Sequence, residues 1–153
     1  MKSLVASGEF AKALSLVQIP GTDFLLKNAK GVCLLRLGKF DAAVPLYREI
    51  VFNAGCVWVR PEVPTFYKVN FATALILSGN IDGGSNILAQ SMDENNEAAL
   101  RLQACVQRWR RSYPLWKKIV WAVGLGPANN APLTLDFEPG VFEDSVVYPL
   151  SRT

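Results

Sequence analysis

The sequence predicts an all-α protein in which antiparallel helix pairs stack side by side and a non-helical tail follows them. Three observations support this fold class. A short pattern recurs along the chain, apolar residues around it follow helical spacing, and glycines and prolines stand where the predicted helices end. The chain has 153 residues, half of them hydrophobic, which is enough for one domain with a real core.

The recurring pattern is centred on a glycine. The segments SGEFAKALSLV, LGKFDAAVPLY and SGNIDGGSNIL align without gaps, with their glycines at Gly8, Gly38 and Gly79. A weaker fourth match, RSYPLWKKIVW, has Ser112 in the glycine position. The spacings of 30, 41 and 33 residues scatter around the roughly 34 residues of a helix-turn-helix repeat. We therefore expect one helix pair for each complete pattern.

The chain starts with an incomplete pair. Residues 1–18 are predicted to be helical and to match the second helix of a pair whose first helix is absent or very short. Two explanations stay open at this point. The helix is either an N-terminal cap of the array, as such arrays need at their ends, or part of a longer repeat protein.

The first complete pair begins after the stop and cap residues Pro20–Asp23. Apolar residues at i, i+3 and i+4 spacing then predict a helix over Phe24–Leu37. Gly38 should end this helix, because glycine adopts the left-handed conformation at little cost. Asp41 falls in the first turn of the next helix, where its charge suits the helix dipole, and Pro45 should kink that helix.

Two further pairs follow. The second is predicted over Thr65–Leu77 and Ile81–Gln90, and the third over Asn95–Arg111 and Pro114–Val123. The 41-residue spacing requires an insertion between the first two pairs. We place it at residues 53–65, since that stretch contains two prolines and a glycine.

Small, aromatic and aliphatic residues recur at matching positions of the first two complete pairs. These residues are Gly31, Leu34, Gly38, Phe40, Ala43 and Tyr47 in one pair and Phe71, Ala72, Leu75, Gly79, Ile81, Gly84 and Leu88 in the next. The pattern resembles the tetratricopeptide repeat family over roughly residues 1–123. The resemblance implies a right-handed array of about three repeats, which we assign to a domain over residues 1–124, with residues 125–153 as the tail.

The resemblance also implies a function, that of a non-enzymatic scaffold. In this family the first helix of each pair lines a concave groove that binds a peptide or helix of a partner protein. Carried over residue by residue, the groove positions are Leu25, Asn28, Val32, Leu35, Arg36, Phe66, Val69, Thr73, Ile76, Trp109 and Arg110. We expect Leu25, Leu35 and Phe66 to be exposed in this groove, although apolar residues at helical spacing also fit a buried core.

One subfamily is excluded as a model. Chaperone-binding arrays hold a C-terminal carboxylate with a Lys/Asn/Arg clamp. Val32 stands where that clamp needs asparagine, and no lysine precedes it in register. The partner is therefore a protein or peptide of another kind.

Enzymatic and metal chemistry find little support in the sequence. There is no histidine, so neither a Ser-His nor a Cys-His pair can form and no imidazole can bind a metal. Glycine loops of the Walker or Rossmann type are missing as well. Cys33, Cys56 and Cys105 are far apart and odd in number, which favours reduced thiols in a cytoplasmic protein. We predict no catalytic residues, no metal and no cofactor.

A basic stretch with aromatic residues, Arg101–Lys118, supports an alternative function. Such a surface could bind nucleic acid, with arginines on phosphates and rings for stacking. A net charge of +3 is low for that class, so we treat nucleic acid as an unlikely partner.

No segment reaches the roughly 20 apolar residues of a membrane helix, and we expect no membrane association. An apolar array can also pair with itself as a homodimer.

The tail from residue 125 is rich in proline and acidic residues. Leu133–Phe137 alternates like a strand, and Pro139-Gly140 is typical of a turn. We expect residues 127–150 to run extended along the repeats, with their acids near Arg108, Arg110, Arg111, Lys117 or Lys118. A cap over the last helix pair is the favoured arrangement. Occupation of the groove, by this tail or that of a neighbouring chain, is the second.

Overall fold

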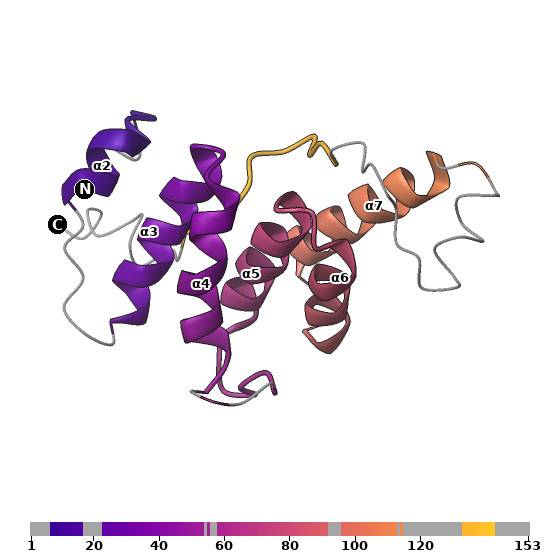
Figure 1. Cartoon of the computed structure of the whole chain (residues 1–153), viewed down its shortest axis with the longest axis horizontal. Coiled ribbons are helices and arrows are strands. Elements are labelled where there is room, and N and C mark those ends of the chain that lie inside the picture. Colours follow the sequence, from indigo (N-terminus) through magenta and orange to yellow (C-terminus); the bar gives the residue numbers. More distant parts are fainter. Residues whose placement is uncertain are drawn as a thin grey trace, which may run out of the picture.

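The protein is all-helical in the part described by the computed structural model, which covers residues 7–16, 23–53, 55, 58–91, 96–112, 114 and 133–142. Within these residues the only strand-like pairing is a bridge between Phe52 and Val59. The helices are α2 (Phe10–Leu16), α3 (Phe24–Arg36), α4 (Phe40–Val51), α5 (Thr65–Leu77), α6 (Ile81–Gln90) and α7 (Glu97–Ser112). Each helix packs against the next along the chain, as Figure 1 shows. The all-α fold class is thereby confirmed.

The glycines of the recurring pattern share one backbone conformation. Gly8, Gly38 and Gly79 have φ values of +76°, +71° and +96°, and a helix begins two residues after each of them. In the turns at Gly38 and Gly79 the same two hydrogen bonds close the preceding helix. Lys39 N–H donates to Leu34 O at 2.9 Å, and Asn80 N–H donates to Leu75 O at 2.8 Å. This 6→1 bond, with the shorter one made by each glycine N–H, is the Schellman arrangement that a left-handed residue permits.

The N-terminal helix is shorter than predicted. Ser7, Gly8 and Glu9 form a turn rather than helix, because Gly8 lies in the left-handed region. The prediction of helix over residues 1–18 is therefore wrong for residues 7–9. Residues 1–6 and 17–18 lie outside the described part of the chain.

The remaining boundaries follow the sequence closely. Helices α5 and α6 have the predicted bounds, and Pro45 lies inside α4. Helix α7 begins at Glu97, because the Asn96 side chain accepts a hydrogen bond from Ala99 N–H at 3.0 Å and so caps it. Residues 115–123 of the last predicted helix lie outside the described residues.

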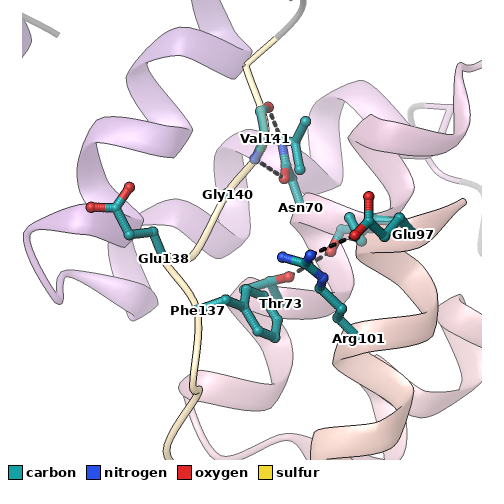
Figure 2. Close-up of a pocket in the computed structure, with 10 residues that line it drawn as sticks. Asn70, Thr73, Glu97, Arg101, Phe137, Glu138, Gly140 and Val141 are labelled. Carbon is teal, nitrogen blue, oxygen red and sulfur yellow. Dashed lines mark hydrogen bonds and ion pairs between the residues drawn. The ribbon is translucent and has the colours of Figure 1, made fainter. Parts of the chain in front are cut away.

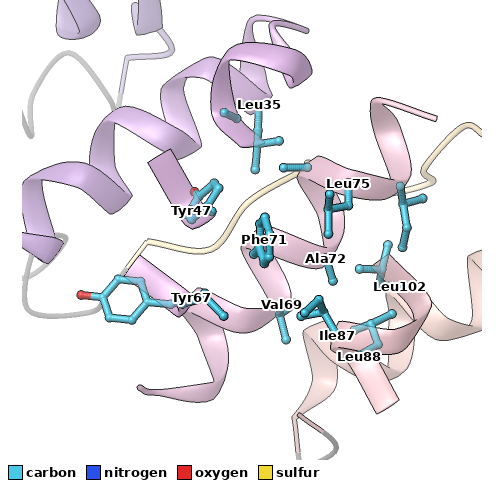
Figure 3. Close-up of a cluster of buried hydrophobic side chains, with 14 of the residues drawn as sticks. Leu35, Tyr47, Tyr67, Val69, Phe71, Ala72, Leu75, Ile87, Leu88 and Leu102 are labelled. Atoms are coloured by element: carbon cyan, nitrogen blue, oxygen red, sulfur yellow. The ribbon is translucent and has the colours of Figure 1, made fainter. Parts of the chain in front are cut away.

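Helix α5 forms the centre of the core. All of its residues from Tyr67 to Ile76 are buried, because α5 contacts α3, α4, α6 and α7. Phe71 and Leu75 point into the cluster that Figure 3 shows, together with Tyr47 from α4 and Leu102 from α7. Contacts on every side bury this helix all round, and its buried polar residues Lys68, Asn70 and Thr73 all make hydrogen bonds.

Two glycines allow the close approach of neighbouring helices. A Cβ atom at Gly31 would lie 2.5 Å from Cζ of Tyr47, and one at Gly84 would lie 2.5 Å from Cγ1 of Ile76 and 2.8 Å from Ala72 O. Such distances are too short for packed atoms. The glycines are thus required by the packing of α3 on α4 and of α5 on α6.

Two kinds of feature are absent from the described residues. None of the helices they form is both long and apolar enough to span a bilayer. They also bring together no group of three or more Cys, Asp or Glu side chains that could hold a metal ion.

Gly84→Ala tests the packing of α5 on α6. In an exposed helix this change would stabilise the protein by about 1 kcal/mol. Here the new methyl group would collide with Ile76 and with the backbone of α5, so we expect the free energy of unfolding to fall by about 1–3 kcal/mol. Urea denaturation measures it. The exposed residue Asn86 of the same helix provides the control, because Asn86→Ala should leave stability equal or higher. A gain in stability for Gly84→Ala would contradict this packing.

Candidate binding groove

The candidate site is the face that α3, α5 and α7 form together, and residues 133–142 of the tail, which we call the bound segment, lie across it. Helix α5 contacts both α3 and α7. The bound segment crosses from the side of α7 to the side of α3 (Figure 1), with Asp136 bound to α7 and Gly140 against α3. Three helices far apart in the sequence thus share one stretch of the tail.

Asn70 in the middle of α5 holds the main chain of the bound segment. Its Nδ2 donates to Val141 O at 2.8 Å, and its Oδ1 accepts from Val141 N–H at 2.8 Å. Figure 2 shows the two bonds side by side, with the amide of Asn70 facing the peptide groups of one residue. A side-chain amide has one acceptor and two donors, so it can satisfy both main-chain groups at once. This contact makes no use of the Val141 side chain.

Asn28 on α3 completes a small polar network. Its Oδ1 accepts from Asn70 Nδ2 at 2.8 Å, and its own Nδ2 donates to Val141 O at 3.4 Å. Asn28 and Asn70 are 1% and 0% exposed. The hydroxyl of Tyr47 donates to Asn28 O at 3.4 Å, and burial raises the pKa of this phenol, which therefore stays protonated as a donor. Buried amides need such partners, because an unpaired polar group in the core costs about 1–3 kcal/mol.

Arg36 at the end of α3 binds the preceding stretch of the segment. Its Nε donates to Pro139 O at 2.6 Å, one terminal nitrogen donates to Gly140 O at 3.3 Å, and the other forms an ion pair with Glu138. The guanidinium carbon lies 5.7 Å from the centre of the Phe10 ring on α2. Burial lowers the pKa of Arg36, but a guanidinium remains charged at neutral pH. A planar fork with five donors suits this combination of two carbonyls and one carboxylate.

Gly140 is the point of closest approach to α3. Its φ is +88°, and a Cβ atom there would lie 3.0 Å from Val32 Cγ1 and 3.2 Å from Leu35 Cδ1. Val32 and Leu35 are 0% and 1% exposed, so neither side chain is free to move away. Glycine is thus favoured at this position by backbone conformation and by space.

Phe137 lines a cavity of about 380 Å³ between α5 and α7. Val69, Asn70 and Thr73 line one side of it, and Ala98 and Arg101 the other. In Figure 2 the Phe137 ring lies near Thr73 and Arg101, whereas Glu138 points away from them. The side chains of Phe137 and Glu138 thus leave the segment on opposite sides.

Asp136 attaches the segment to α7. Its carboxylate accepts from Arg108 at 3.0 Å and from the Cys105 thiol at 3.3 Å. The hydrogen bond from Arg108 holds the pKa of Asp136 below its usual value, and the bond from Cys105 adds to this effect. Burial raises the pKa of Cys105, and Asp136 raises it further. At neutral pH the carboxylate is therefore ionised and the thiol is protonated, which is the state that this hydrogen bond needs.

The structure places the sequence-predicted groove residues in three groups. Asn28, Val32, Leu35, Arg36, Val69 and Thr73 contact the bound segment or line the cavity beside it. Leu25 and Phe66 lie in the first turns of α3 and α5 and are half-buried, and the Phe66 ring lies 4.1 Å from that of Tyr67. Ile76, Trp109 and Arg110 form a third group, with contacts elsewhere in the fold.

Two of the predicted groove residues contact α6, and one predicted exposure is wrong. Ile76 packs against Gly84 on α6. Trp109 packs against the core cluster, which includes Leu133 of the bound segment. Arg110 also faces α6, where it binds Asp82 at 3.3 Å and Ser85 at 3.2 Å. Leu35 is not exposed, because it is buried between α3 and the bound segment.

The tail differs from its favoured prediction. The bound segment lies on the groove face of α3 and α5 instead of covering the last helix pair alone. Leu133–Phe137 is not a β-strand, because no neighbouring strand pairs with it within the described chain. Its acids reach arginines of two helices. Asp136 pairs with Arg108, as predicted, but Glu138 pairs with Arg36 on α3. Glu143, Asp144, Lys117 and Lys118 lie outside the described residues.

Asn70 is the important residue that the sequence-based prediction missed. It stands alone as an amide in the apolar stretch VNFATALIL. Such a position predicts a buried polar group that needs a partner. The family resemblance drew attention to its neighbours Val69 and Thr73 instead.

Asn70→Leu tests whether the two main-chain bonds hold the segment. Leucine has a similar size and suits the apolar surroundings, so the helices should stay folded. Without the bonds to Val141, we expect residues 133–142 to take up deuterium at least about tenfold faster. Hydrogen exchange read by mass spectrometry measures this. Asn96→Ala is the control, since it removes the cap of α7 but no bond to the segment. Unchanged exchange at residues 133–142 would show that Asn70 does not hold them.

Comparison with known proteins identifies no relative of this chain. No protein family model, no curated protein and no solved structure matches this chain. The resemblance to tetratricopeptide repeats therefore rests on the residues that recur in the first two complete helix pairs, and the function has to be argued from the geometry of the groove.

Proposed function

We propose that this protein is a non-enzymatic protein-interaction module whose groove binds an extended peptide of a partner protein. One observation carries the proposal. The buried amide of Asn70 pairs with both the N–H and the C=O of Val141. Two adjacent bonds of this kind recognise main chain in an extended conformation, and they are the same whichever side chain the residue carries. The bound segment then represents the way a partner peptide lies in the groove.

The helical architecture supports this proposal. Helices α3, α5 and α7 supply the polar contacts that hold the bound segment, and the ring of Phe10 on α2 lies behind Arg36. A surface made of successive first helices is what a right-handed tetratricopeptide-like array would present. We include this repeat class and its handedness in the proposal.

The contacts of α7 favour this function over nucleic-acid binding. Arg101 pairs with Glu97 at 2.5 Å, Arg108 with Asp136 at 3.0 Å and Arg110 with Asp82 at 3.3 Å. Arginines that are already paired with carboxylates within the chain have less charge to offer to phosphates. The basic aromatic surface Arg101–Lys118 remains the alternative.

A cytoplasmic location and a homodimer belong to the same proposal. Cys33 and Cys105 are free and buried, and burial raises the pKa of both thiols, as expected of cysteines used as apolar core residues. A bound segment that reaches the groove of a second copy would produce a dimer by exchange. Size-exclusion chromatography over a range of concentrations distinguishes a dimer from a monomer.

Peptide binding can be tested in a chain whose own segment is weakened. Gly140→Ala lies outside the helices, strains the backbone at φ +88° and brings a Cβ to 3.0 Å from Val32 Cγ1, so it should lower the occupancy of the groove by the segment while the fold stays intact. We expect a fluorescent peptide of residues 133–142 to bind this variant saturably in anisotropy titrations. Adding Asn70→Leu to the same chain should weaken binding at least about tenfold. Absence of saturable binding to the vacated groove would overturn the proposed function.

A further inference from the structure

We propose that the groove selects an acidic peptide with aspartate, an aromatic residue and glutamate in succession and glycine two places after the glutamate. A partner protein that presents this pattern displaces the bound segment. The pattern is that of Asp136, Phe137, Glu138 and Gly140. This inference rests on the proposed function, and it adds the chemistry of the partner.

The main-chain contact fixes the register on which selection depends. Asn70 binds both peptide groups of Val141, and Arg36 binds the carbonyls of the two preceding residues. A peptide held at three consecutive residues cannot slide by one position without losing these bonds. Each side chain N-terminal to Val141 therefore meets a fixed part of the groove.

The glycine position is selected by exclusion. Any larger residue at position 140 would need φ near +88° and would press its Cβ against Val32 and Leu35. Both side chains are fully buried, so the few tenths of an ångström that such a contact needs would have to come from packed side chains or from a shift of the peptide. A peptide with alanine there should bind at least about tenfold less tightly.

The two acidic positions are selected by charge. Arg36 is largely buried, with 14% of its side chain exposed, and its fork is held by two carbonyls and the Phe10 ring. Those carbonyls belong to positions 139 and 140 of the same peptide, so main-chain binding there orients the fork toward a carboxylate at position 138. The carboxylate at position 136 meets a different helix, where Arg108 and Cys105 receive it. Each exposed ion pair alone contributes little to the binding free energy. A lysine at either position would instead be repelled by an arginine.

The aromatic position leaves room for a better ligand than the bound segment. A cavity of about 380 Å³ remains beside Phe137, between Thr73 on α5 and Arg101 on α7. A tryptophan or tyrosine at this position can fill more of it and can place a polar ring atom near Arg101 or Glu97. The bound segment is tethered to the groove, and its effective concentration there is on the order of millimolar. A partner with a larger aromatic residue would bind more tightly than the segment and could therefore compete with it.

The selectivity test uses the full-length Gly140→Ala chain and a set of labelled peptides. The reference peptide has the sequence of residues 133–142. The first variant peptide carries both Asp136→Lys and Glu138→Lys. The second carries Gly140→Ala, and the third carries Phe137→Trp. We expect the first two to bind at least about tenfold more weakly than the reference and the third to bind equally or more tightly. A chain with Asp136→Lys and Glu138→Lys in its own segment provides a second vacated groove with unaltered helices.

The outcomes separate this inference from the proposed function. Equal binding of the reference, charge-reversed and alanine peptides would overturn the selectivity and leave a groove that binds main chain alone. Failure of every peptide to bind either vacated groove would overturn both. Displacement is read in the natural chain, where an excess of the Phe137→Trp peptide should increase deuterium uptake at the chain's residues 133–142. Unchanged uptake at peptide concentrations that saturate the vacated groove would refute displacement.

Discussion

The structure depends on the need of one buried amide for partners. Asn70 lies in the central helix, is 0% exposed, and has apolar neighbours on both sides in the sequence. Its hydrogen bonds join it to Asn28 on the adjacent helix and to the peptide groups of Val141. Because a buried polar group without a partner is costly, the amide connects the helical layer to a segment 71 residues further along the chain. An apolar residue in its place would leave the packing of the helices intact but remove the two main-chain hydrogen bonds that hold the segment at Val141.

The segment in turn explains why α5 is buried on every side. Helices α3, α4, α6 and α7 cover most of its surface, and residues 137–141 cover the face around Val69, Asn70 and Thr73. The same contacts that complete the core also describe how a peptide would be held, through main-chain pairing at Val141, close packing at Gly140 and carboxylates at positions 136 and 138.

Local features of the sequence predicted the helices well, whereas the site was predicted only in part. Gly38 and Gly79 mark their helix ends because a left-handed residue is a local requirement, visible in one stretch of sequence. Asn28, Val32, Leu35 and Arg36 could be predicted because they lie on one helix face. The contacts of Ile76 and Arg110 with α6 were not predicted, since helical periodicity does not say which neighbour a face meets. The pairing of Asn70 with Val141 depends on the tertiary fold, and a lone amide in an apolar helix was its only sign.

The thiol beneath Asp136 makes occupancy of the groove observable from within the molecule. Cys105 is buried, and its Sγ lies 3.3 Å from the carboxylate of the bound segment. Departure of that carboxylate would uncover the thiol and remove one of the influences that raise its pKa. The rate of alkylation at Cys105, separated by mass spectrometry from alkylation at Cys33 and Cys56, would then measure the fraction of molecules with an empty groove. The protein thus carries its own chemical probe, at the place where an external label would disturb the contact it is meant to report.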